Sequence, residues 1–321
     1  MTNATITGGA GFLGSHLAEA LVKIGQTVTV LDNFSSGLRN NVSSLEPNGV
    51  KVIEGDCKNI ADVTRAISDS NVVYHFGGLS DVRLATSNPS ACYRENVYAT
   101  HVLLEAMRKT SVKTVVFAST STVYGDALMI PTPESYSPLT PISMYGSSKL
   151  LAERLVASRC GASKKKAIIL RMANIVGPRN HHGVISDLTR KLKDFPPRLE
   201  VLGDGHQLKS YLHVRDCIQA ILFASQNQAG PTEVYNVGSD DQIEVRRIVQ
   251  ILIDEIGFGN VELRFTGGTD GRGWRGDVKN MHLDTTKLKG TGWKPTCTSE
   301  ESIRLTIRET TAELLSQPVA T

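Results

Sequence analysis

Cysteine is scarce in this sequence and follows no pattern. The 321 residues include five scattered cysteines, and no two of them form a C-x-x-C pair. An odd number of scattered cysteines argues against a disulfide framework, and the lack of paired cysteines argues against a structural zinc site. We therefore expect a cytoplasmic protein that holds no metal.

Long apolar runs and long runs of one charge are absent as well. No apolar stretch approaches the roughly 20 residues that cross a membrane, and the first predicted strand begins so early that we expect no cleavable signal peptide. The net charge is +3, and the short basic run Lys164–Lys166 precedes an apolar strand, which suits a solvated turn. We expect neither a membrane nor a nucleic acid among the partners.

What the sequence does contain is a regular alternation of two patterns. Short apolar runs, typical of strands buried on both faces, are separated by stretches with helical periodicity. This order predicts an α/β fold, a Rossmann-type doubly wound parallel sheet. The predicted strands are Ala4–Thr7, Thr27–Leu31, Val50–Glu54, Val72–Phe76, Thr114–Ser119, Ala167–Arg171 and Val234–Val237, and the predicted helices are 13–24, 60–67, 90–109, 143–159 and 216–226.

The alternation breaks after Arg171, which indicates a second domain. A chain of this length usually exceeds one hydrophobic core. We predict a large domain from residues 1–174 plus 211–238, and a smaller α/β domain from residues 175–210 plus 239–321. The second segment of the smaller domain has an amphipathic helix near 245–256 and another near 299–315.

The glycine-rich stretch Thr7–Ser15 joins the first strand to the first helix. Gly8 permits a tight turn, Gly11 lets a pyrophosphate approach the backbone, and Gly14 lets the helix pack closely on the strand. The spacing is G-x-x-G-x-x-G, and the alternative is an ordinary strand–helix turn. The position between strand and helix favours a dinucleotide-binding turn, with the helix N-terminus facing the anion.

Acidic residues at the ends of the next two strands refine this prediction. Asp32, 18 residues after Gly14, is placed to accept hydrogen bonds from the adenosine ribose, which favours NAD over NADP. The alternative is that Asp32 caps the turn that follows it, and Arg39 nearby could accommodate a 2′-phosphate. Asp56 either reaches the adenine or caps the helix near residue 60.

Tyr145 and Lys149 form a Y-x-x-x-K pair on a predicted helix, where residues i and i+4 share a face. A lysine ammonium, together with a positive nicotinamide, would stabilise a tyrosinate and lower a pKa that is ordinarily near 10. Hydroxyl residues end the fifth strand, at the sheet edge where ligands bind in such folds. Thr120 could share a proton with Tyr145, although some of these hydroxyls would serve only their own turn.

Five motifs carry a resemblance to a known family: GGAGFLG at 8–14, DNFSSG at 32–37, STSTVYG at 119–125, YGSSK at 145–149 and RMAN at 171–174. The chain resembles the extended short-chain dehydrogenases/reductases along essentially its whole length, and is most similar to their UDP-glucose/UDP-galactose 4-epimerase group. The resemblance implies NAD held through the catalytic cycle, a nucleotide sugar in the smaller domain and a homodimer joined by helices 90–109 and 143–159. It also implies that the reaction is transient oxidation of the sugar at C4.

Carried over by position, the resemblance implies that Tyr145 is the base, that Lys149 is its partner and that Thr120 is the catalytic hydroxyl. Cofactor-side positions are Gly8, Gly11, Phe12, Leu13, Gly14, Asp32, Asn33, Ser36, Gly37, Asp56, Cys57, Phe76, Gly77, Gly78 and Asn96. Substrate-side positions, beside Thr120 and Tyr145, are Ser121, Thr122, Asn174, Lys209, Arg272 and Met281.

Differences from related enzymes narrow the expected reaction. Sugar 4,6-dehydratases and UDP-glucuronate decarboxylases have a carboxylate just after the catalytic threonine, whereas this chain has Ser121 and Thr122. Lys209 and Trp274 stand where the family usually has diphosphate-binding arginines, so we assign that role to Arg272. Met281 stands where the family selects against 2-acetamido sugars, and its slim side chain would admit them.

These features favour a UDP-glucose/UDP-galactose 4-epimerase. The alternatives are a UDP-N-acetylhexosamine or UDP-glucuronate 4-epimerase, another sugar-nucleotide enzyme of the same fold, or a non-catalytic NAD-binding regulator. The presence of Thr120, Tyr145 and Lys149 together argues against the regulator.

Overall fold

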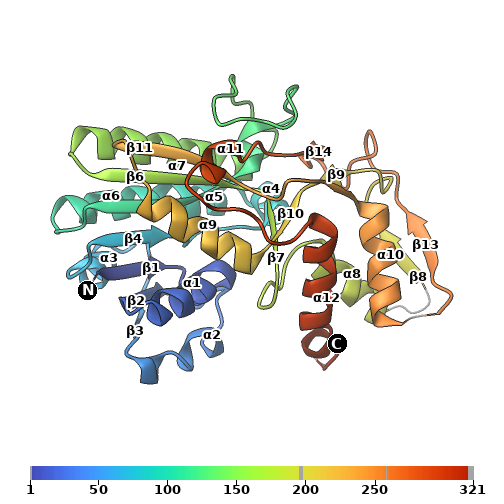
Figure 1. Ribbon diagram of the computed structural model, residues 1–321, viewed down its shortest axis with the longest axis horizontal. Helices are drawn as coiled ribbons and strands as arrows, with labels where there is room; N and C mark the ends of the chain where they lie inside the picture. Colours follow the sequence, from blue (N-terminus) through green and yellow to red (C-terminus); the bar gives the residue numbers. More distant parts are fainter. Residues whose placement is uncertain (1, 195–197, 258, 317–321) are drawn as a thin grey trace.

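The computed structural model describes residues 2–194, 198–257 and 259–316 (Figure 1). Its centre is a seven-stranded parallel sheet, as predicted, and each predicted strand is present in it. The strands are β1 (Asn3–Thr7), β2 (Thr27–Asp32), β3 (Lys51–Glu54), β4 (Val72–His75), β5 (Thr114–Thr120), β6 (Lys166–Met172) and β11 (Thr232–Val237).

The strand order is β11-β6-β5-β4-β1-β2-β3. The chain builds outward from β1 to β3 on one side, then returns to β4 and builds outward on the other. The order therefore reverses between β1 and β4, and ligands of such sheets bind at the carboxyl ends of the strands beside this point. The glycine turn at Gly8 leaves β1 at that edge.

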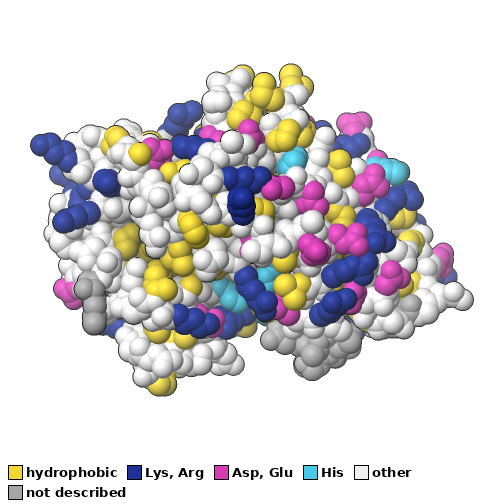
Figure 2. Space-filling model, in the orientation of Figure 1, with side chains coloured by type: hydrophobic (Ala, Val, Ile, Leu, Met, Phe, Trp, Pro, Cys, Tyr) yellow, Lys and Arg dark blue, Asp and Glu magenta, His cyan; other side chains and the backbone are white. Residues whose placement is uncertain are grey.

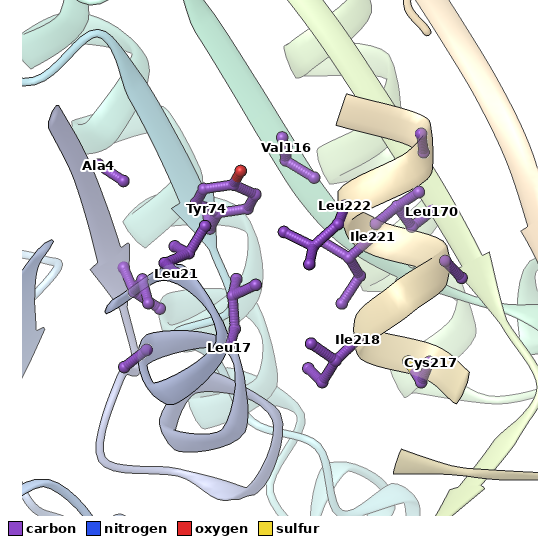
Figure 3. Packing of buried hydrophobic residues seen from close by; sticks show 14 of the residues in the cluster. Ala4, Leu17, Leu21, Tyr74, Val116, Leu170, Cys217, Ile218, Ile221 and Leu222 are labelled. Carbon is purple, nitrogen blue, oxygen red and sulfur yellow. The ribbon is translucent and has the colours of Figure 1, made fainter. Parts of the chain in front are cut away.

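Helices cover both faces of the sheet because neighbouring strand residues point to opposite sides. On one face, Leu17 and Leu21 pack opposite Ile218 and Ile221 over Tyr74 of the sheet (Figure 3). On the other face, a second apolar cluster joins three helices to the alternate strand residues. The first face carries α1 (Phe12–Lys23) and α9 (Val214–Gln226), and the second carries α3 (Ile60–Ile67), α6 (Ala99–Arg108) and α7 (Met144–Ala162).

The smaller part of the molecule has short strands and its own apolar cluster, centred on α10 and α12 (Figure 1). Leu288 and Trp293, although late in the chain, pack instead in the cluster of the large sheet. The division into two domains stays a prediction. Leu288 belongs to α11 (Thr286–Lys289), which packs against β11 and α9. The elements of the smaller part are β7 (Asn174–Val176), α8 (Val184–Asp194), β8 (Arg198–Val201), β9 (Leu208–Lys209), β10 (Tyr211–His213), β12 (Ile243–Glu244), α10 (Val245–Ile256), β13 (Glu262–Phe265), β14 (Asn280–Met281) and α12 (Ser299–Ser316).

Two local features differ from the sequence predictions. The predicted helix 90–109 is built from α5 (Pro89–Cys92), a π-helical turn (Tyr93–Tyr98) and α6. Helix α3 is capped by Asn59, whose side chain accepts a hydrogen bond from the Ala61 N–H at 2.9 Å, so Asp56 is not its cap. Further short helices are α2 (Asn40–Ser43), α4 (Val82–Ser87) and two 3₁₀ turns, Glu46–Asn48 and Ser121–Tyr124. None of the helices in the described ranges is long and apolar enough to span a membrane.

Candidate active site

A cavity of about 780 Å³ lies at the carboxyl edge of the sheet, between it and the smaller part of the molecule. Its walls include the glycine turn after β1, the ends of β2, β4 and β5, and residues of α8 and β9. The fold therefore creates the cavity at the point where the strand order reverses, as the sheet topology predicts.

The glycine turn is built for close approach of a phosphate. Gly8 has a φ of +67°, and a Cβ on Gly14 would lie 2.3 Å from the Gly8 carbonyl oxygen. Helix α1 follows with no side chain capping its start at Gly11, so its first N–H groups are left for a ligand. Together with Phe12 and Leu13, these glycines line the cavity.

Asp32 is held in place by the backbone. Its two carboxylate oxygens accept hydrogen bonds from the N–H groups of Ala10, at 2.9 Å, and Phe34, at 2.8 Å, and burial raises its pKa. It lines the cavity with Asn33, Ser36 and Gly37. Arg39 instead pairs with Glu54 at 3.1 Å and lies over the Phe34 ring. This arrangement fits a ribose diol and leaves Arg39 engaged outside the cavity walls.

The remaining cofactor-side positions follow the same edge. Asp56 accepts a hydrogen bond from the Asn33 amide at 3.1 Å and pairs with Lys58 at 3.0 Å. Asp56, Cys57, Phe76, Gly77 and Gly78 all line the cavity. A backbone-lined groove with an acidic residue on its rim fits NAD, so the residues present are suited to hold it.

Tyr145, Thr120 and Lys149 meet in the middle of the cavity wall. The Thr120 side chain is near enough to the Tyr145 hydroxyl to favour its ionised form, but burial outweighs this effect and raises the pKa of Tyr145 to about 12. Lys149 donates to the Ala118 carbonyl at 3.0 Å, and its own burial lowers its pKa to about 8. Lysine alone therefore does not lower the tyrosine pKa. The predicted lowering also needs the positive nicotinamide, and it stays a prediction for the loaded protein.

A buried network fixes helix α7 against β5, and the sequence analysis missed it. Glu153, four residues after Lys149, accepts a hydrogen bond from Ser119 and pairs with Arg171 at 2.8 Å. Lys149 and Glu153 thus bind consecutive residues of β5, from successive turns of one helix face. The i+4 spacing to Lys149 could have revealed Glu153.

The substrate-side wall brings together Asn174, Lys209, Trp274 and Asp277. The Asn174 amide donates to the Ser210 carbonyl at 3.2 Å. Lys209 forms an ion pair with the buried Asp277, and its ammonium lies 5.4 Å from the centre of the Trp274 ring. The lysine charge is therefore balanced within the protein.

Three predicted site residues lie outside the cavity walls. Asn96 is buried, where its amide bonds Leu79 and Ser148. Arg272 pairs with Asp126 at 2.8 Å, and Met281 packs in an apolar cluster with Val123 and Tyr124. Asn96 therefore holds the segment that follows β4, and the diphosphate role of Arg272 and the sugar-sensing role of Met281 stay predictions.

Charged residues that the sequence analysis did not select also line the cavity. Arg83 of α4 and Asp187 of α8 form an ion pair of 3.0 Å between the two sides of the cavity. Arg179 bonds Ser15 at 3.2 Å and pairs with Glu19, both on α1. Their partners lie more than 100 residues away, so no local pattern indicates these contacts.

A Rossmann-type sheet, a cradle for a dinucleotide phosphate and a Thr–Tyr–Lys set in one cavity define an NAD-dependent enzyme. The model of the NAD dependent epimerase/dehydratase family matches residues 4–238, and the chain belongs to this family. Like the epimerases of the family, it is an isomerase.

Proteins of known or assigned activity are similar to this chain over nearly its whole length. A putative UDP-glucose 4-epimerase of Methanocaldococcus jannaschii is 31% identical over 93% of this chain and 95% of its own. A crystal structure of UDP-galactose 4-epimerase is 42% identical with a TM-score of 0.87, covering 98% of this chain and 100% of that one. A human dTDP-D-glucose 4,6-dehydratase is 28% identical over 94% of this chain and 88% of its own.

Proposed function

We propose that the protein is a UDP-hexose 4-epimerase that interconverts UDP-glucose and UDP-galactose. The observation that carries this proposal is the state of the carboxylates in the cavity. An elimination of water from the sugar needs a carboxyl group available as acid or base, and the residues after Thr120 are Ser121 and Thr122. Among the described residues that line the cavity, each carboxylate has a partner inside the protein.

These partners are of two kinds. Asp32 and Asp81 accept backbone N–H groups, the latter from Arg83 at 2.8 Å. Asp56 and Glu95 pair with Lys58, Asp187 with Arg83, and Asp277 with Lys209. A reaction that uses only hydroxyl and lysine chemistry fits this cavity better than dehydration or decarboxylation does.

The residues of the chain then have distinct tasks. Tyr145 takes the proton of the sugar 4-hydroxyl, and Thr120, beside it in the cavity wall, orients that hydroxyl. Lys149, whose burial lowers its pKa to about 8, would stabilise the phenolate together with the positive nicotinamide. NAD, which the glycine turn and Asp32 would hold, would supply the hydride acceptor for C4 of the sugar and the hydride donor for the 4-keto form. Asn174 and Lys209 line the part of the cavity that holds the diphosphate.

A neutral hexose suits the cavity better than a glucuronate. Apart from Lys149, the lysines and arginines among its described lining residues are all paired with carboxylates: Arg83 with Asp187, Arg179 with Glu19, Lys191 with Glu200 and Lys209 with Asp277. A sugar carboxylate would have to break one of these pairs. UDP-N-acetylhexosamines stay an alternative, tested below.

We also propose a homodimer in the cytoplasm. Large apolar side chains are exposed on the π-helical turn and on α7, which belong to the two helices that the family resemblance assigns to the dimer interface, and on α4, which contacts α7. They are Leu84, Tyr93, Tyr98, Met144 and Leu151, each 44–55% exposed. Exposed apolar side chains gathered on these helices favour association.

The test is a product-resolved assay with a panel of nucleotide sugars. Purified protein is incubated with UDP-glucose, UDP-galactose, UDP-GlcNAc, UDP-glucuronate, dTDP-glucose and GDP-mannose, and products are separated by chromatography with mass detection. We expect UDP-glucose and UDP-galactose to approach one equilibrium mixture from both sides with no change of mass. A product that has lost water or carbon dioxide would contradict the proposal. Turnover of UDP-GlcNAc alone would show that the substrate is a UDP-N-acetylhexosamine and not UDP-glucose or UDP-galactose.

A further inference from the structure

His75 is a buried histidine at the end of β4 that has no part in the reaction steps given above. It is 1% exposed, and its two ring nitrogens contact two buried hydroxyls: Nδ1 lies 2.7 Å from Oγ1 of Thr7, and Nε2 lies 3.0 Å from Oγ1 of Thr100. Burial, with a smaller contribution from the charge of Lys149, lowers the pKa of His75 to about 3. The ring is therefore neutral near pH 7, with one nitrogen that donates a hydrogen bond and one that accepts.

The contacts of Thr100 determine which nitrogen carries the proton. The Thr100 hydroxyl donates to the Asn96 carbonyl at 2.6 Å, so toward His75 it can only accept, and the ring proton lies on Nε2. Nδ1 is consequently an acceptor and takes the proton of the Thr7 hydroxyl. The Cys57 thiol also lies beside Thr7, but sulfur is a weak acceptor and does not compete with the imidazole nitrogen.

The Thr7 hydroxyl connects this ring to the glycine turn after β4. The Phe76 N–H donates to the Thr7 carbonyl at 3.1 Å, and the next N–H, of Gly77, donates to the Thr7 side-chain oxygen at 3.2 Å. The side chain of Thr7 thus continues the strand pairing by one residue, into the turn. A hydroxyl proton that pointed toward Gly77 would oppose its N–H, so the acceptor Nδ1 of His75 keeps the free electron pair of Thr7 directed to the turn.

The turn at Gly77 belongs to the dinucleotide side of the cavity. Gly77 and Gly78 line the cavity, and a Cβ on Gly8 would lie 2.6 Å from the Gly77 nitrogen, so the two glycine turns are in direct contact. The Asn96 amide holds the same segment, because its Oδ1 accepts from the Leu79 N–H at 2.8 Å. A displacement of the Gly77 turn would therefore alter the cradle that begins at Gly8.

We propose that His75 is a positioning residue for the NAD site. Its neutral ring, with the proton on Nε2, directs the Thr7 hydroxyl to Gly77 and so holds the Gly77 turn against the Gly8 turn. Four hydrogen bonds run in one direction, from the Gly77 N–H through Thr7, His75 and Thr100 to the carbonyl of the π-helical turn, and bonds in such a chain strengthen one another. The proposal concerns NAD and is independent of the sugar that the enzyme converts.

The first experiment exchanges threonines of β1. Thr7→Val removes the acceptor for Gly77 at nearly constant volume, and Thr7→Ser keeps it. Thr5→Val is the matched control: Thr5 is as buried as Thr7, lies two residues earlier, and its hydroxyl bonds the Ala66 carbonyl at 2.8 Å and the Ser70 hydroxyl at 2.6 Å, none of which lines the cavity.

NAD binding is measured by calorimetry on dialysed protein and by the NAD retained after gel filtration. We expect Thr7→Val to bind NAD about tenfold more weakly, as for one lost hydrogen bond. Thr7→Ser and Thr5→Val keep the affinity within about threefold, although the melting temperature of Thr5→Val falls as that of Thr7→Val does. Equal NAD affinities for Thr7→Val and Thr5→Val would overturn the proposal.

The second experiment divides the two functions of the ring. His75→Asn places an amide oxygen near the position of Nδ1, and His75→Gln places an amide nitrogen near the position of Nε2. Because only the acceptor reaches Thr7, we expect His75→Gln to lose about tenfold in NAD affinity and His75→Asn to lose at most about threefold. Excess NAD restores the conversion rate of His75→Gln. Equal losses in the two variants would contradict the proposed direction of the chain.

Nitrogen-15 NMR of the wild type determines the tautomer directly and does not depend on the folding of any variant. We expect His75 to carry its proton on Nε2 and to stay neutral between about pH 8 and pH 5, a range in which an ordinary histidine titrates. A proton on Nδ1, or a ring that becomes charged within this range, would overturn the proposal.

Discussion

The two walls of the cavity are built on different principles. The wall toward β1 and β2 is largely backbone: the glycine turn, uncapped N–H groups at the start of α1, and Asp32 held by two main-chain N–H groups. The wall toward β9 and α8 consists of side chains, and its charges are paired with one another, Lys209 with Asp277 and Arg83 with Asp187. Charged groups also cover the outside of this smaller part (Figure 2).

This difference determines which ligand specificity can change by substitution. A wall built mostly of backbone leaves few side chains to exchange beyond Asp32, so most of the dinucleotide site is fixed once the strand–turn–helix forms. A side-chain wall can be altered by one substitution at a time without changing the fold, which is how one scaffold serves many sugars. Tyr145 and Thr120 lie between the two walls.

The largest expected effect is at this junction. Tyr145→Phe removes the group that takes the proton, and we expect kcat to fall about 10²–10⁴-fold, with bound NAD unchanged. Tyr136→Phe is the control, because that hydroxyl serves only the Leu128 N–H at 3.1 Å. The measurement is the initial rate of UDP-galactose conversion, and a Tyr145→Phe variant with a tenth of the wild-type rate would refute the assigned base.

The next effect tests the backbone wall. Gly14→Ala places a methyl group 2.3 Å from the Gly8 carbonyl oxygen, and we expect it to lower stability by about 1–3 kcal/mol and to empty the NAD site. Gly161→Ala, in α7, is the control. A Cβ at residue 161 would have no neighbour within 4 Å, so we expect the stability to be unchanged or to rise by up to ~1 kcal/mol. Thermal melts and the NAD released on denaturation check both, and equal NAD contents would contradict the expectation.

The smallest expected effect distinguishes Lys209 from Arg272 as the cation that binds the substrate. Lys209 lines the cavity and Arg272 does not, so Lys209→Gln raises KM about tenfold while Arg272→Gln changes it less than twofold. The exposed Arg272–Asp126 pair contributes about 0–1 kcal/mol of stability, so its loss is mild. Steady-state kinetics of both variants show which cation contributes to substrate binding. A larger KM change for Arg272→Gln would support the sequence prediction that Arg272 binds the diphosphate.

The sequence predicted the backbone wall well and the side-chain wall poorly. The seven strands, the glycine turn and the Tyr145–Lys149 pair follow from local periodicity and spacing, and the family resemblance adds Thr120. The structure brings these residues together at one cavity. Arg272 and Met281 were selected by their place in a motif, yet the loop geometry directs Arg272 to Asp126 and Met281 into an apolar cluster.

Contacts between distant segments account for the rest. Asn96 lies in a π-helical turn that no residue pattern announces, and its amide bonds a segment 17 residues away. For Asp56 the sequence left open whether it reaches the adenine or caps the helix near residue 60, and the structure shows that Asn59 caps this helix.

The ion pair between Arg83 and Asp187 has a consequence for timescales. Arg83 is 47% exposed, and an ion pair in such a setting contributes about 0.2–1 kcal/mol. That free energy slows any motion that must separate Arg83 from Asp187 by about fivefold at most. The ion pair therefore joins the two sides of the cavity only weakly, and a ligand that has to pass between them is delayed by no more than this factor.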